Sequence, residues 1–192
     1  MFFYDTEKFL VVCNLRCGHT SMAHRFGMKA HTLPENHPDL SPENWLDKFK
    51  NSKAKTKVIV IRNPWDRLQS AINICSIAKK DSGMVFDEKF VRGHSNLYLS
   101  ELNDSGFEDY YIIDFYKFSD YVPTRGHLNV STNANYSGAK ERLFDSEGNY
   151  LQNTRYSRYW PMEELHKEDK AYNKIMKRQP KLPVTLFQTF YK

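Results

Sequence analysis

Two segments of this sequence place arginine and hydroxyl side chains directly after apolar runs. The first is Arg16-Cys-Gly-His-Thr-Ser21, which follows the run Lys8–Cys13. A glycine at such a junction lets the backbone approach an anion, and a helix that starts there offers free N–H groups and a positive dipole end. The segment is built like a phosphate-binding loop, although it lacks the first glycine and the lysine of a Walker A motif. An ordinary turn with a helix cap is the alternative interpretation.

The second segment is Arg62-Asn-Pro-Trp-Asp-Arg-Leu-Gln-Ser70, which follows the run Lys57–Ile61. Arg62 ends a predicted strand, and Ser70 lies about two turns into the predicted helix, so both side chains can reach one anion beside the helix start. A guanidinium is a planar fork that matches phosphate, and a hydroxyl adds a further donor. Arg67 shares the face of Ser70; alternatively, it pairs with a nearby acid as a solvated surface charge.

The elements around these segments follow from the apolar pattern. Lys8–Cys13 and Lys57–Arg62 are continuous apolar runs, typical of strands buried on both faces of a parallel sheet. Thr20 or Ser21 is predicted to cap a helix that ends near Met28, and Asn63 with Pro64 to begin a helix that ends near Lys79, with Asp66 answering the cap. The remaining predicted elements are a strand at Lys29–Leu33, helices at Glu43–Phe49, Phe86–Leu102 and Pro161–Lys177, a strand at Tyr110–Phe118 and an edge strand at Val184–Phe190.

Strands that alternate with helices predict a three-layer α/β/α fold with a mainly parallel central sheet. In such folds, ligands bind beyond the carboxyl ends of the strands. The 192 residues fit one domain, 1–192, and 40% hydrophobic with 27% charged residues exclude a disordered or collagen-like chain. No apolar run is long enough to span a membrane, and the first residues carry charges where a signal peptide needs an apolar stretch, so we expect a cytoplasmic protein.

The cysteines and the net charge narrow the classes of partner. Cys13, Cys17 and Cys75 are an odd number without a further Cys/His cluster, so neither a disulfide framework nor a metal site is expected. The net charge of +5 favours anionic ligands. Lysine and arginine are spread among acids, without a basic stripe or a known RNA-binding motif, which argues against a nucleic-acid-binding module.

Taken together, the two segments resemble sulfotransferases that use 3′-phosphoadenosine 5′-phosphosulfate (PAPS). Arg16–Ser21 is similar to the 5′-phosphosulfate loop of that family, which usually shows Lys or Arg, x, Gly and then a Ser/Thr pair. Arg62 and Ser70 have the spacing of the family's 3′-phosphate motif. Lys29-Ala-His-Thr-Leu-Pro34 is similar to the Lys-Thr-His-Leu-Pro stretch of the cytosolic branch, in which the histidine is the catalytic base. These motifs stand in the family's order between Phe9 and about Ile77.

The resemblance implies a P-loop-like sulfotransferase fold and an in-line transfer of the sulfuryl group to an acceptor hydroxyl, with 3′-phosphoadenosine 5′-phosphate (PAP) as product and no metal. Charge grows on the leaving-group oxygens, and positioned cations stabilise it. Arg16 would supply this charge, although the family usually has lysine there and arginine cannot donate a proton to the leaving group. The implied cofactor-binding residues are Arg16, Cys17, Gly18, His19, Thr20, Ser21, Arg62 and Ser70.

A histidine suits the role of base, because its pKa lies near neutrality. His31 is the first candidate and His94, on the predicted helix Phe86–Leu102, is the reserve. The basic segment Tyr136–Arg142 is either a loop that closes over the cofactor or an ordinary surface loop. Tyr156, Tyr159 and Trp160 either line an acceptor pocket or pack in the core.

The sequence also admits two alternative functions. A P-loop-type phosphotransferase is disfavoured, because the Walker lysine is missing and Arg62 follows the strand where such an enzyme needs an acid for magnesium. A catalytically inactive module that only binds the nucleotide is a further alternative. The acceptor is expected to be a saccharide or a small alcohol or phenol, and the sequence does not determine the oligomeric state.

Overall fold

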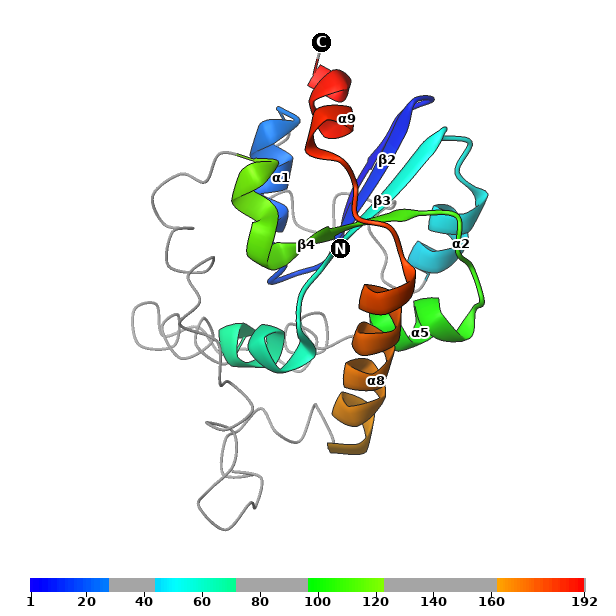
Figure 1. Ribbon diagram of the computed structural model, residues 1–192, viewed down its shortest axis with the longest axis vertical. Helices are drawn as coiled ribbons and strands as arrows, with labels where there is room; N and C mark the ends of the chain where they lie inside the picture. Colours follow the sequence, from blue (N-terminus) through cyan, green and yellow to red (C-terminus); the bar gives the residue numbers. More distant parts are fainter. Residues whose placement is uncertain (28–43, 72–96, 123–161, 192) are drawn as a thin grey trace.

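The computed structural model describes residues 1–27, 44–71, 97–122 and 162–191 (Figure 1). These residues form an α/β fold around an open sheet of four strands, β1 (Phe2–Asp5), β2 (Phe9–Cys13), β3 (Thr56–Ile61) and β4 (Tyr111–Asp114), in the order β1-β2-β3-β4. The β2–β3 and β3–β4 pairs are parallel, whereas β1 and β2 are antiparallel. The predicted α/β class is confirmed. The prediction of a mainly parallel sheet is wrong, because the sheet is mixed.

The antiparallel edge strand β1 was not predicted, because its turn carries no sequence signal. β1 and β2 form a hairpin around Glu7 and Lys8, without the glycine or asparagine that usually marks so tight a connection. The hydroxyl of Thr6 holds the turn: it donates to the Phe9 carbonyl at 3.0 Å and accepts from the Phe9 N–H at 3.1 Å. These side-chain bonds add to two backbone hydrogen bonds between Thr6 and Phe9, at 3.0 and 3.3 Å.

The two predicted central strands are confirmed. Every residue of β2 is buried, and so is every residue of β3 after Thr56. Cys13 is the register partner of Val60, so the carboxyl ends of β2 and β3 lie side by side. Because parallel strands end at the same edge of a sheet, this register brings the residues after Cys13 next to those after Ile61.

Helices flank the sheet at both of these strand ends. Helix α1 (His19–Arg25) follows β2, and residues 64–71 are helical after β3, as predicted. The N-cap of α1 is Gly18, so the prediction that Thr20 or Ser21 caps this helix is wrong. Asn63 does cap its helix: its side-chain oxygen accepts from the Trp65 N–H at 2.9 Å.

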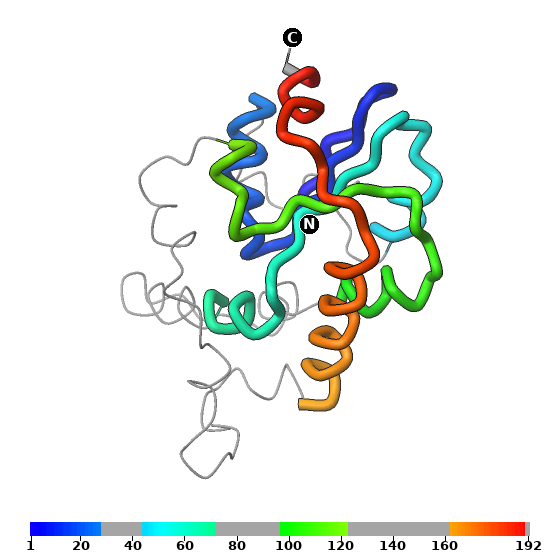
Figure 2. The backbone as a smooth tube through the Cα atoms, in the orientation of Figure 1, coloured from blue at the N-terminus to red at the C-terminus, as the bar shows by residue number. Residues whose placement is uncertain are grey.

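Three further helices pack on one side of the molecule, where Figures 1 and 2 show α5 and α8 side by side. They are α2 (Trp45–Asn51), α5 (Tyr98–Asp104) and α8 (Met162–Arg178), and the predicted helices at Glu43–Phe49 and Pro161–Lys177 are thereby confirmed. Leu97 is the non-helical N-cap of α5, so the predicted helix Phe86–Leu102 does not run unbroken to its end. None of the helices among the described residues has the length and apolar character to cross a membrane.

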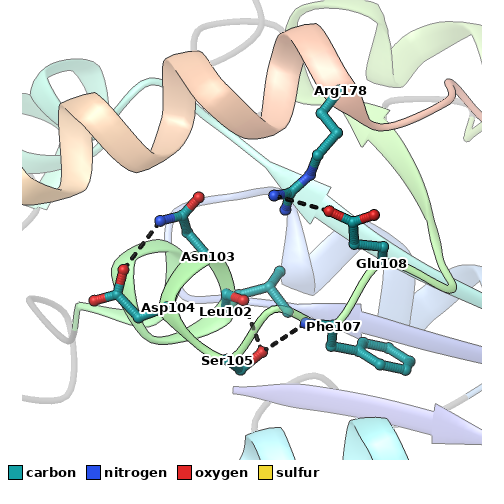
Figure 3. Close-up of polar contacts among 7 residues, drawn as sticks. All are labelled: Leu102, Asn103, Asp104, Ser105, Phe107, Glu108 and Arg178. Carbon is teal, nitrogen blue, oxygen red and sulfur yellow. Dashed lines mark hydrogen bonds and ion pairs between the residues drawn. The ribbon is translucent and has the colours of Figure 1, made fainter.

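The segment between α5 and β4 carries the surface ion pair in Figure 3. Arg178, the last residue of α8, reaches Glu108 at 3.1 Å, and both side chains are partly exposed. Nearby, the Ser105 hydroxyl donates to the Leu102 carbonyl and accepts from the Phe107 N–H, which closes the end of α5. Exposed ion pairs of this kind contribute little to stability.

The predicted strand Tyr110–Phe118 ends early. Extended backbone is confined to β4, and the 3-10 segment η4 (Phe115–Asp120) follows. The Asp114 carboxylate accepts from the Tyr116 N–H at 3.1 Å, which caps the first turn of η4. A short polar side chain at this position therefore ends the strand.

The predicted edge strand at Val184–Phe190 is wrong. These residues form the helix α9 (Val184–Gln188) and the 3-10 turn η8 (Thr189–Tyr191). Phe187 and Phe190 both contact Phe9, with ring centroids 5.8 and 3.7 Å away. Residues three apart share a face of a helix but would point to opposite faces of a strand. A different residue pairs with the edge of the sheet: Lys181, which precedes α9, forms an isolated parallel bridge with Ile112 of β4.

Glu168 is a fully buried carboxylate that joins α8 to α5. It accepts from the Ser100 N–H at 2.7 Å and the Leu99 N–H at 3.3 Å, and burial raises its pKa above the ordinary value of 4.5. A carboxyl that binds its proton more tightly in the folded state destabilises the fold as pH rises.

We therefore expect the free energy of unfolding of the wild type to fall, relative to Glu168→Gln, as pH rises from 4.5 to the raised pKa. The slope is at most about 1.4 kcal/mol per pH unit for one proton. Urea unfolding of both proteins at a series of pH values measures it, and a difference that does not change with pH would contradict the assignment.

Candidate functional site

The loop between β2 and α1 has a backbone conformation that few sequences adopt. The Cys17 N–H donates to the Asn14 carbonyl at 3.1 Å, and the Asn14 side chain accepts from the Leu15 N–H at 2.8 Å. Arg16 has φ 65° and Gly18 has φ 87°, both in the left-handed region. This conformation is unfavourable for a residue such as arginine, and it persists only where the surroundings hold it.

Two buried arginines from the second segment hold this loop by its carbonyl oxygens. Nη1 of Arg62 donates to the Arg16 carbonyl at 2.8 Å, and Nε of Arg67 donates to the Leu15 carbonyl at 3.1 Å. Charged donors make stronger hydrogen bonds than neutral ones. The segment 62–70 thus shapes the loop 14–18, and the two predicted segments do meet in space.

The side chain of Arg16 contacts Ser70 directly. Nε and Nη2 of Arg16 both donate to the Ser70 hydroxyl, at 3.0 and 2.9 Å. The sequence places these two residues in different phosphate subsites, whereas the structure joins them in one cluster with Arg62. Because the hydroxyl is the acceptor in both bonds, Ser70 still has its own hydrogen to donate.

The cluster of Arg16, Arg62, Arg67 and Ser70 is largely buried. Arg62, Arg67 and Ser70 are each 1% exposed, and Arg16 is half-buried. The guanidinium carbon of Arg62 lies 4.3 Å from the centroid of the Phe115 ring. Charges in such surroundings are weakly screened by solvent and salt.

Two cysteine thiols lie in and beside the loop. Cys13 and Cys17 are free and fully buried, and burial raises the pKa of the Cys17 thiol, while the guanidiniums of Arg67, Arg62 and Arg16 act to lower it. The Cys13 thiol donates to the Cys17 carbonyl at 3.2 Å. Both side chains therefore help to shape the loop as protonated thiols.

Asp66 belongs to the same helical segment, 64–71, as Arg67. It is buried and accepts a hydrogen bond from the Tyr116 hydroxyl. Burial, and then the hydrogen bond to Asp66, raise the pKa of Tyr116 above its ordinary range. This bond from the Tyr116 hydroxyl to the carboxylate, which the sequence assigned to the helix cap, ties the helix 64–71 to η4.

The structure describes some of the predicted site residues and leaves others outside. His19 and Thr20 are half-buried at the start of α1, with His19 Nε2 3.5 Å from the Thr20 hydroxyl, and Ser21 is buried. The two candidate bases, His31 and His94, lie outside the described residues. So do Lys29–Leu33, Cys75, Tyr136–Arg142, Tyr156, Tyr159 and Trp160.

Two residues of the site were not identified from the sequence. Arg67 is not a solvated surface charge, because its side chain is buried and bonded to the loop. Phe118 packs against Gly18 from η4, far away in the chain. The only signal for Arg67 was the face it shares with Ser70, and no local pattern marks Phe118.

Gly18 offers a test of the loop. A Cβ on Gly18 would lie 3.0 Å from Cζ of Phe118, in addition to the strain at φ 87°. Gly106 has φ 66° with nothing within 4 Å, so it isolates the backbone strain. We expect Gly106→Ala to lower the free energy of unfolding by about 1 kcal/mol, and Gly18→Ala by about 2 kcal/mol or more. Urea unfolding measures both variants, and equal losses would show that Phe118 moves away without cost.

A comparison of the chain with protein-family models, with curated proteins and with solved structures found no match.

Proposed function

We propose that this protein is a sulfotransferase that takes the sulfuryl group from PAPS. The observation that carries the proposal is the convergence of Arg16, Arg62 and Ser70, from the two segments with the family's spacing, at the carboxyl ends of adjacent strands. Two guanidiniums and a hydroxyl in a buried setting match the phosphate and sulfate oxygens of such a cofactor.

The residues of the cluster have separate roles in this reaction. Arg62 and Ser70 hold the 3′-phosphate, and Arg16 with the loop 17–21 holds the 5′-phosphosulfate. On binding, Arg16 exchanges at least part of its contact with Ser70 for the anion. Its charge stabilises the negative charge that develops on the leaving phosphate as the sulfur–oxygen bond breaks.

His31 completes the reaction in this proposal. Its imidazole takes the proton from the acceptor hydroxyl as that oxygen bonds to sulfur, and PAP leaves as the second product. The acceptor is a saccharide or a small alcohol or phenol. Arginines supply the positive charge, so the proposal needs no metal ion for the transfer.

Titration of the wild type with PAP, and separately with ATP and magnesium, tests the proposal. We expect PAP to bind without a metal and to raise the unfolding midpoint by several degrees at saturation, because a ligand that binds only the folded state stabilises it. Calorimetry with and without a chelator measures the affinity. Binding of ATP and magnesium alone would favour a phosphotransferase, and binding of neither ligand would overturn the nucleotide site.

A further inference from the structure

Arg67 belongs to the cluster, but the proposed reaction gives it no role. It comes from the helical residues 64–71, its Nε donates to the Leu15 carbonyl at 3.1 Å, and its guanidinium carbon lies 4.9 Å from the centroid of the Tyr98 ring in α5. Both Arg67 and Tyr98 are fully or almost fully buried. One side chain thus links three segments that are distant in the sequence.

Arg67, Tyr98 and the loop 14–18 form a closed ring of contacts. The Tyr98 hydroxyl lies 3.5 Å from Sγ of Cys17, so α5 meets the loop one residue beyond Arg16, while Arg67 meets it one residue before. Glu168 of α8 holds the first N–H groups of α5, and the positive charge of Arg67 partly offsets the effect of burial on its pKa. Helix α5 therefore contacts Arg67 directly, and helix α8 holds α5 in place.

This ring surrounds the residue with the unusual backbone. Arg16 has φ 65°, a conformation that costs free energy and needs support from its neighbours. Its own carbonyl is held by Arg62 and the preceding carbonyl by Arg67, so the peptide units on both sides are fixed. With these units fixed, the Arg16 side chain is directed at Ser70.

We propose that Arg67 is a positioning residue, which holds the loop 14–18 in the conformation that binds the anion. The inference rests on the proposed function, because it assigns the loop to cofactor binding. It implies that α5 and α8, which contribute no predicted cofactor contact, support the affinity of the site through Arg67.

The variants Arg67→Met and Arg67→Lys test the inference, with Arg178→Met as a matched control that removes the same charge from the exposed pair with Glu108. Three measurements are made on each protein: PAP affinity at low and at high salt, the unfolding midpoint, and amide hydrogen exchange of the loop 14–18 without ligand. Exchange separates a local release of the loop from global unfolding.

We expect Arg67→Met to bind PAP about 30-fold more weakly than the wild type at either salt concentration, with faster exchange in the loop. Arg67→Lys keeps a donor but lacks the planar face, and should lose about 5-fold. If Arg67→Met does not fold, Arg67→Lys carries the test. Arg178→Met should match the wild type.

Two results would overturn the inference: wild-type affinity in Arg67→Met, or a loss of affinity without faster exchange in the loop, as expected if Arg67 acts on the anion only through its charge. The wild type distinguishes this failure from that of the proposed function. If the wild type and Arg67→Met bind PAP equally well, only the role of Arg67 is contradicted. Wild type that does not bind PAP contradicts the function, and the inference with it.

Discussion

Arg62→Met should weaken PAP binding about 100-fold, because the variant loses a charged, buried donor that holds the loop and, in the proposed function, binds the 3′-phosphate. In the structure this guanidinium donates to the Arg16 carbonyl at 2.8 Å and stacks on Phe115. Methionine keeps much of the apolar contact with the ring and removes the charge. The loss should therefore appear chiefly in affinity, measured by calorimetry.

The control for Arg62 is Arg178→Met, which removes one positive charge from the exposed ion pair in Figure 3. It should leave PAP affinity unchanged within about 2-fold, since exposed charges are screened by solvent and salt. Thermal unfolding of both variants shows whether a loss of binding reflects a loss of fold. Equal affinities for Arg62→Met and wild type in a folded protein would contradict the assignment of the 3′-phosphate to Arg62.

His31→Ala should lower the turnover of sulfuryl transfer by about 100-fold to 10,000-fold, the usual contribution of a positioned base. PAP affinity should stay near that of the wild type, because the proposed phosphate contacts come from Arg16, Arg62 and Ser70. Single-turnover transfer from PAPS to a reactive phenol, measured beside PAP binding, separates the two effects.

His94→Ala is the matched control, since it changes the reserve candidate in the same way. If His31 is the base, His94→Ala should retain turnover within about 5-fold, and the pH profile of the wild type should show a group that must lose its proton near neutrality. Full activity of His31→Ala with loss in His94→Ala would move the role to His94. Binding of PAP without any turnover in the wild type would favour the inactive nucleotide-binding module.

Local sequence determined the elements with strong patterns. Phe9–Cys13 and Thr56–Ile61 are continuous apolar runs, and such runs are stable only when both faces of the strand are buried. Asn63 followed by proline begins a helix through local hydrogen bonds and a preset φ, which need no distant partner. The proximity of the two arginine segments also follows, because adjacent parallel strands end at one edge of the sheet.

Tertiary contacts decided the elements whose local signals are weak. Val184–Gln188 is helical because Phe187 and Phe190 must both reach Phe9, which is far away in the chain. The contacts of Phe187 and Phe190 with Phe9 are not visible in a window of a few residues, whereas the Thr6–Phe9 contact of the β1 hairpin is local but lacks the usual turn residues.

In the candidate site, too, local sequence determined some features and tertiary contacts decided others. Residue types and spacing predicted Arg16, Arg62 and Ser70, because an anion needs donors at the start of a helix and at the end of a strand. That Arg16 binds Ser70, and that Arg67 lies buried between Leu15 and Tyr98, depends on how α5 and α8 pack behind the loop. A buried arginine and a solvated one have the same local sequence, and only the surrounding helices decide which of the two the chain contains.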